Sequence, residues 1–265
     1  MKLLWLTDIH LNFLNQDQIE AFLRKAAENQ PDAVLLSGDI GESGDVTSHL
    51  RLMESAFACP IYFVLGNHDF YGGGIDRTRA TIADLTAANK NLFWLSGNGV
   101  VKLTDSTALI GHDSWADGRY GDYERSRVML NDYIYIKEFL PLTKAERLDL
   151  MRSLAQEAAD HIEHLLPKAL NGATTVIALM HAPPFRRACR YRGLIGDDEH
   201  LPHYSTKVVG DILRTMMIKH PRHKLVVLCG HTHDAGEYDV LDNLEVNVGG
   251  ATYGDPRVQK IIDIT

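Results

Sequence analysis

The stretch "KLVVLCGHTHDAGEY", residues Lys224 to Tyr238, carries the pattern that decides the fold. An apolar run typical of a buried strand ends at a glycine, and His231 and His233 follow with one threonine between them. A lone histidine after a strand is usually a surface or hydrogen-bonded group, so this stretch by itself does not identify a site. The question is whether other predicted strands end in the same kind of residue.

Four further apolar runs also end in side chains that can bind a metal. These are "LLWLTDIH", "VLLSGD", "FVLGNHD" and "VIALMH", and they supply Asp8, His10, Asp39, Asn67, His68, Asp69 and His181. Because the carboxyl ends of parallel strands meet at one edge of an α/β sheet, we expect these residues to converge there. In extended chain, side chains at positions i and i+2 point the same way. Both members of Asp8-x-His10 and of His231-x-His233 are therefore expected to face one site.

The order of the predicted elements indicates an α/β fold. Strand patterns at 2–9, 32–39 and 61–69 alternate with helical patterns at 15–30 and 45–57, which predicts a parallel sheet covered by helices. Strands joined by tight turns are expected over 92–115, with antiparallel or mixed pairing. A helix capped by Thr143 and Glu146, a strand at 174–181, a helix at 205–220 and antiparallel strands in the tail should follow.

No linker or internal repeat interrupts this pattern. We therefore expect one domain over 1–265, with a candidate rim insertion at 116–140 and an Arg-rich loop at 182–204. Long loops of this kind tend to be functional or disordered.

Composition excludes several functional classes. The 265 residues carry a net charge of −8, which argues against an extended nucleic-acid surface or an anionic membrane surface, although a local basic patch stays open. The three cysteines are far apart and suggest no disulfide framework, and no apolar run is long enough to span a membrane. We therefore expect a cytoplasmic protein, whose oligomeric state the sequence does not indicate.

The residue types at the strand ends suit divalent metal ions. Carboxylate, imidazole and amide ligands without thiolates are typical of Mn²⁺, which we favour, and of Fe, Zn²⁺, Co²⁺ or Ni²⁺. So many ligands exceed what one ion can bind when it must also hold water and substrate. They predict two divalent ions that share a carboxylate.

The ordered set D-x-H, G-D, G-N-H-D, H and G-H-x-H resembles the calcineurin-like metallophosphoesterase superfamily from Asp8 to His233. The resemblance implies a four-layer α/β/β/α sandwich of two mixed sheets flanked by helices. It also implies a metal-dependent hydrolase of phosphate esters. The first ion would be held by Asp8, His10, Asp39 and His233, and the second by Asn67, His181 and His231 together with Asp39 as the bridge.

The same resemblance suggests catalytic roles. A metal-bridging hydroxide would attack phosphorus in line, and His68 would serve as general acid for the leaving group. Glu42, in "GDIGE", stands where several family members carry the acidic residue that orients this histidine, although its side chain is longer. Asp69 could act chemically or could hold its loop by hydrogen bonds.

The sequence says less about the substrate. Arg186, Arg187 and Arg190 follow His181 and could bind an anionic substrate at the rim of the site, or could form an ordinary solvated loop. Arg119, Arg125 and Arg127 form a second, weaker candidate rim. We expect a small phosphodiester or nucleotide, with a phosphomonoesterase or protein phosphatase as the alternative. A non-catalytic protein-binding scaffold is a further class, but such members usually lose metal ligands that this chain keeps.

Overall fold

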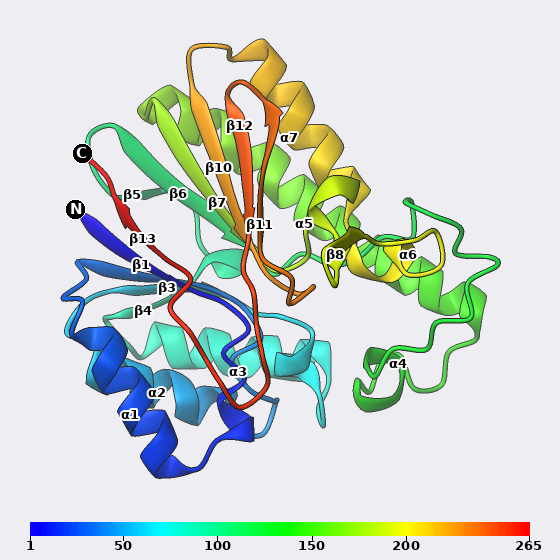
Figure 1. The fold of residues 1–265 in the computed structure, drawn as a ribbon, viewed down its shortest axis with the longest axis horizontal. Helices are drawn as coiled ribbons and strands as arrows, with labels where there is room; N and C mark the ends of the chain where they lie inside the picture. The colour runs from blue at the N-terminus through cyan, green and yellow to red at the C-terminus, as the bar shows by residue number, and fades with distance from the viewer.

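A computed structural model describes residues 1–265, and it contains two sheets packed face to face between helices (Figure 1). The first sheet has the order β13 (Lys260–Asp263), β1 (Lys2–Leu6), β2 (Ala33–Ser37), β3 (Ile61–Val64) and β4 (Leu92–Trp94). The second has the order β11 (Gly236–Leu241), β12 (Leu244–Val248), β10 (Lys224–Cys229), β7 (Thr175–Met180), β6 (Thr107–His112) and β5 (Val101–Lys102).

Helices cover the outer face of each sheet (Figure 1). Those on the first sheet are α1 (Gln16–Ala27), α2 (Val46–Ala56) and α3 (Ile75–Ala87), and those on the second are α5 (Lys144–Gly172) and α7 (Lys207–Lys219). The shorter elements α4 (Asp132–Tyr135), α6 (Leu201–Tyr204), β8 (Arg190–Tyr191) and β9 (Leu194–Ile195) lie in the connections. Short 3₁₀ turns span Leu11–Phe13, His68–Phe70, Leu95–Gly97 and Arg186–Ala188.

Both sheets are mixed and lie between layers of helices, which confirms the four-layer sandwich. Strands β1 to β4 run parallel in the first sheet, and β6, β7, β10 and β12 run parallel in the second. Antiparallel strands lie only at the edges, where β13 pairs with β1, β5 with β6, and β11 with β12. The parallel centre of each sheet is what brings the functional strand ends together.

Strand alternation explains how one sheet serves two cores. In β1, Leu4 and Leu6 belong to the core beneath the helices, whereas Leu3 and Trp5 belong to the core between the sheets. Successive strand side chains point to opposite faces, so an unbroken apolar run buries both faces. Truncating one such residue, for example Leu4→Ala, is expected to cost about 2–5 kcal/mol of stability.

Three local expectations were incomplete. The sequence reading did not predict α3, although Ile75, Ile82 and Leu85 form its buried stripe. The 92–115 segment is mixed as expected, but β4 joins the first sheet and β5 and β6 join the second. In the tail, β11 and β12 are antiparallel as expected, whereas β12 also pairs in parallel with β10.

The capping box at the start of α5 is confirmed. The Thr143 side chain accepts from the Glu146 amide, and the Glu146 carboxylate accepts from the Thr143 amide. The last strand, β13, pairs with the first, β1. This pairing supports our proposal that 1–265 is one domain. None of the helices has the length and apolar character needed to cross a lipid bilayer.

Candidate metal centre

The carboxyl ends of β1, β2 and β10 bring four residues into one cluster. The members are Asp8, His10, Asp39 and His233, whose candidate ligand atoms all lie within 4.8 Å of one another. The Nε2 atoms of His10 and His233 are 3.1 Å apart, and His233 Nε2 lies 3.3 Å from Asp8 Oδ1. Two ligands of one ion bound at about 2.0–2.2 Å lie about 3 Å from each other, so the spacing fits a single metal ion.

A second group lies on the other side of Asp39. His181 Nε2 is 3.0 Å from Asn67 Oδ1 and 3.4 Å from Asp39 Oδ1. The ring of His231 lies 4.9 Å from that of His181, centroid to centroid. The other oxygen of Asp39, Oδ2, lies 3.7 Å from His10 Nε2. The carboxylate of Asp39 therefore has one oxygen toward each group.

Burial favours the neutral forms of several cluster residues. Burial lowers the pKa of His10 to about 2 and lowers that of His231 well below its usual value. Burial, reinforced by the charges of Asp8 and Asp69, raises the pKa of Asp39. A metal ion needs neutral imidazoles and ionised carboxylates, and its charge would offset the cost of keeping two carboxylates buried side by side. His10 Nδ1 is also a buried atom without a hydrogen-bond partner.

The backbone reaches these positions through left-handed turns, not extended chain. Asp8, His10, Asp39, His231 and His233 have φ values of 48°, 40°, 54°, 72° and 57°. The D-x-H and H-x-H pairs therefore do not lie in extended chain, and the expectation that strand alternation orients their side chains was wrong. Non-glycine residues in this region are uncommon and cluster at functional sites, where surrounding structure holds them.

Gly66 and Gly230 are required because ligand side chains from other strands approach them closely. A Cβ at Gly66 would overlap the Asp39 carboxylate, and a Cβ at Gly230 would overlap the carboxylate of Asp8. The glycines that precede Asn67 and His231 therefore make room for ligands that come from other strands.

Asp69 holds the loops after β2 and β3 together. Its carboxylate accepts hydrogen bonds from the backbone amides of Asp39, Ile40, Gly41 and Gly66, at 2.8–3.0 Å. The side chain is fully buried. Of the two roles left open for Asp69, the structure supports loop organisation.

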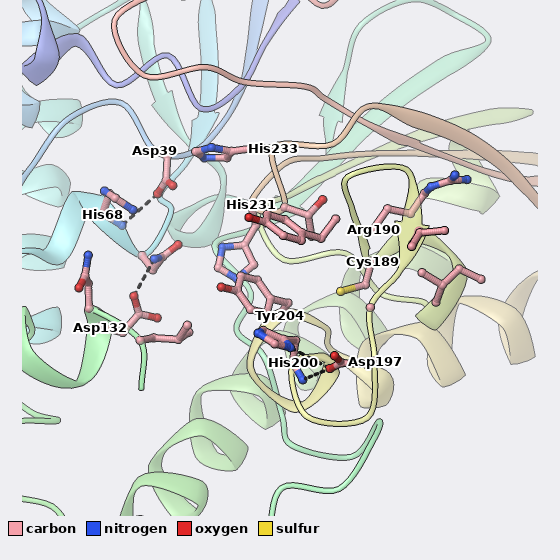
Figure 2. Close-up of a pocket in the computed structure, with 18 of the residues that line it drawn as sticks. Asp39, His68, Asp132, Cys189, Arg190, Asp197, His200, Tyr204, His231 and His233 are labelled. Atoms are coloured by element: carbon pink, nitrogen blue, oxygen red, sulfur yellow. Dashed lines mark hydrogen bonds and ion pairs between the residues drawn. The ribbon is translucent and has the colours of Figure 1, made fainter. Parts of the chain in front are cut away.

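His68 lies beside the clusters (Figure 2). Its ring stacks on that of Tyr71, with the centroids 4.3 Å apart. Its Nε2 is 3.5 Å from the hydroxyl of Tyr253. Burial lowers the pKa of His68 to about 4. Glu42 does not orient it: the Glu42 carboxylate accepts from the Asn12 side-chain amide, at 3.4 Å, and forms no hydrogen bond with His68.

Asp132 is a site residue that sequence reasoning missed. Its Oδ1 accepts from Asn67 Nδ2 at 2.8 Å and from the Tyr71 hydroxyl at 2.6 Å. Because the Asn67 amide nitrogen is occupied in this way, its oxygen points to His181. The sequence carries no signal for this role, since Asp132 lies in the polar 116–140 segment far from the strand ends.

A pocket of about 720 Å³ opens from the two clusters. It is lined by Asp39, Asn67, His68, Tyr71, Leu130, Asn131, Asp132, Cys189, Arg190, Tyr191, Leu194, Ile195, Gly196, Asp197, His200, Tyr204, His231, Thr232, His233 and Tyr253. Figure 2 shows His68 and Asp132 on one side, and Cys189 and Arg190 on the other. The pocket is thus shared by the strand ends, the 116–140 segment and the 182–204 loop.

The arginines contribute less to the pocket than the sequence suggested. Of the predicted three, only Arg190 lines the pocket, and its guanidinium lies on the side away from His68 and Asp39 (Figure 2). Arg186 instead pairs with Asp198 at 2.8 Å, and Arg187 is exposed and does not line the pocket. The expected Arg119, Arg125 and Arg127 rim does not line it either.

Comparison with solved structures finds the same fold in proteins of low sequence identity. Phosphopantetheinyl hydrolase from Mycobacterium tuberculosis matches with a TM-score of 0.63 and 13% identity, covering 94% of this chain and 89% of that one. A dimetal phosphatase from Danio rerio gives 0.60 and 13%, covering 97% and 89%. GAP50, described as the anchor in the inner membrane complex of Plasmodium, gives 0.54 and 12%, covering 94% and 71%. No curated protein matches significantly in sequence.

The model of the calcineurin-like phosphoesterase family matches residues 1–235, which include every residue of both clusters. The chain therefore belongs to the calcineurin-like phosphoesterase family and is a metal-dependent hydrolase of phosphoric esters.

Proposed function

We propose that the protein hydrolyses a small phosphodiester with two divalent cations. Asp8, His10, Asp39 and His233 would hold one cation, and Asn67, His181 and His231 would hold the other with Asp39. The observation that carries this proposal is the position of Asp39, whose two oxygens face the two groups at 3.7 Å and 3.4 Å.

The chemistry divides between the cations and the chain. When bound, the cations would neutralise charge on the phosphoryl oxygens and lower the pKa of a water for in-line attack. His68 would donate a hydrogen bond or proton to the leaving oxygen. Because burial favours the neutral form of this imidazole, the negative charge of a bound phosphoester would be needed to restore its proton.

The metal is proposed to be Mn²⁺, with Fe, Zn²⁺, Co²⁺ or Ni²⁺ as competitors. Oxygen and imidazole donors suit all of these ions, and no thiol is among the clustered residues.

We also propose a cytoplasmic location, because all three cysteines are unpaired.

A singly charged diester fits the pocket better than a dianionic monoester. Only one of the 20 lining residues is a lysine or arginine, so the protein itself offers little charge beyond the cations. A phosphomonoesterase or protein phosphatase is the alternative within the family. The preference for a small ester over a long nucleic acid rests on the net charge of −8.

A non-catalytic scaffold is the alternative of another class. The fold alone permits it, since GAP50 has a similar fold and is described as an anchor. The complete set of seven candidate ligands counts against it. A scaffold would not need to keep carboxylates and imidazoles buried beside one another at a high desolvation cost.

The test is a matched comparison of two generic esters. Chelator-treated protein is reloaded with each of the five metals and assayed with bis-p-nitrophenyl phosphate and p-nitrophenyl phosphate. We expect metal-dependent turnover, highest with Mn²⁺ and with the diester. Asp39→Asn is the control for contaminating activity. Preference for the monoester would replace the diesterase proposal, and absence of turnover with every metal would favour the scaffold.

A further inference from the structure

We propose that the group esterified to the phosphate is uncharged and apolar, and that it packs against the β8–β9 hairpin. This inference rests on the proposed function, because it takes the phosphoryl group to lie beside Asp39. The hairpin would then determine which esters the enzyme accepts.

The hairpin presents apolar side chains to the pocket. Tyr191, Leu194 and Ile195 all line it, yet they are 64%, 74% and 48% exposed. Leu130, from the 116–140 segment, adds to the apolar lining. Aliphatic side chains left in water beside a binding site indicate a surface that a ligand covers.

The charges of the pocket argue against a charged ester group. Its one cationic side chain of fixed charge, Arg190, already donates to the Gly193 carbonyl and to the Tyr238 hydroxyl. Two further carboxylates line the pocket: Asp132, whose Oδ1 contacts the candidate ligand Asn67, and Asp197, on the side of the hairpin. These acids would repel a second phosphate or a carboxylate on the substrate. The one guanidinium that could offset the repulsion, that of Arg190, already makes hydrogen bonds.

The hairpin is fixed relative to the metal centre. Arg192 and Gly193 form its turn with φ values of 51° and 78°, the left-handed pair that tight hairpins require. The Gly193 amide donates to Asp234 Oδ2 at 2.6 Å, and Asp234 directly follows His233. The apolar wall is therefore tied to the loop that carries two candidate ligands, so it is formed before substrate binds.

The arrangement in space agrees with an extended substrate. Figure 2 shows His68 and Asp39 at one side of the pocket, and His231 and Tyr204 between. Arg190 of the hairpin and the preceding Cys189 lie at the other side. An ester held at Asp39 must cross His231 and Tyr204 to reach the hairpin. The volume of about 720 Å³ leaves room for a group much larger than the phosphate.

The experiment measures inhibition by n-alkylphosphonates from ethyl to hexyl against turnover of bis-p-nitrophenyl phosphate by Mn²⁺-loaded protein. These probes have the same headgroup and differ only in apolar length. A methylene fully removed from water is worth about fourfold in affinity. Since the hairpin is open to solvent, we expect the inhibition constant to fall by roughly two- to threefold per methylene.

Leu194→Ser should flatten this dependence on chain length, and Tyr191→Ser is a second variant of the same wall. Both side chains are exposed, so neither change removes core packing. Ile218→Ser is the matched control, because Ile218 is 58% exposed on α7 and does not line the pocket. It should keep the wild-type dependence.

The failure of this inference and that of the proposed function have different signatures. Normal turnover with inhibition independent of chain length, or an unchanged dependence in both hairpin variants, would overturn the hairpin inference alone. Absence of turnover with every ester and metal would overturn the proposed function. Phosphonate binding measured by calorimetry would then still test the chain-length dependence.

Discussion

Replacing Asp132 by alanine should weaken one metal site and spare the other. Asp132 Oδ1 accepts the hydrogen bonds that fix the side-chain amide of Asn67, at 2.8 Å, and the hydroxyl of Tyr71, at 2.6 Å. Without this acceptor the Asn67 amide keeps only the longer hydrogen bond to the Tyr71 hydroxyl, at 3.3 Å, and its oxygen is held less firmly toward His181. The cation proposed to bind Asn67 then loses an oriented ligand, whereas the Asp8, His10 and His233 side has no contact with Asp132.

The magnitude follows from the bonds involved. A hydrogen bond to a charged group contributes about 1.5–3 kcal/mol, and part of that is the free energy that keeps the amide oriented. Loss of a partner that orients a metal ligand lowers metal affinity by about 10–100-fold, or about 1.4–2.7 kcal/mol. We expect the affinity of the cation proposed to bind Asn67 to fall by this factor, and that of the other cation to change by less than about twofold.

Calorimetric titration of the chelated protein with Mn²⁺, resolved into two binding steps, is the assay. Asp132→Asn is the conservative variant: it can place an oxygen at the Oδ1 position and should recover most of the affinity. Asp197→Ala removes an equal charge from the same pocket without touching a candidate ligand, so it should bind both ions normally. Equal weakening of both ions in Asp132→Ala, or of neither, would refute the orienting role.

Three further changes test the site and the fold. Asp39→Asn should bind fewer than two ions by elemental analysis, and retention of both would show that Asp39 is not the bridge. His68→Ala should keep both ions and lose roughly 10²–10⁴ in kcat, and unchanged turnover of an ester with a poor leaving group would remove it from the reaction. His203 is hydrogen-bonded to Tyr133 and Ser126, and burial lowers its pKa to about 4. Below about pH 6.5 the unfolded chain protonates this histidine before the folded chain does. The free energy of unfolding is therefore highest above about pH 6.5 and falls by about 3 kcal/mol in all as the pH falls toward 4. Urea unfolding at pH 7 and pH 4.5 should show a smaller difference for His203→Gln than for the wild type, and an equal difference would contradict this.

The clustering of the candidate ligands could be predicted from the sequence because each follows an apolar strand. Asp8, Asp39 and His181 could be read as strand-end residues without any knowledge of how the sheets pack. Parallel pairing then brings such ends together in any α/β sheet. The two sheets followed from the resemblance, since strand patterns alone do not say which strands share a sheet.

The remaining features depend on tertiary contacts that no local pattern encodes. Asp132 reaches Asn67 only because the 116–140 segment folds back over the site. Arg186 was a reasonable anion ligand by position, but Asp198, twelve residues later, takes its guanidinium. The left-handed turns at the ligands were also invisible, because the D-x-H spacing is equally compatible with extended chain.

The left-handed backbone at five candidate ligands has a thermodynamic consequence. An L-residue in this region costs about 1–2 kcal/mol relative to glycine, so the five together oppose folding by about 5–10 kcal/mol. That is comparable with the whole net stability of an ordinary domain, about 5–15 kcal/mol. Cations that bind only the folded chain would offset this cost by mass action. The melting temperature of this protein should therefore report the free metal concentration around it, so that a thermal shift becomes a measure of metal supply.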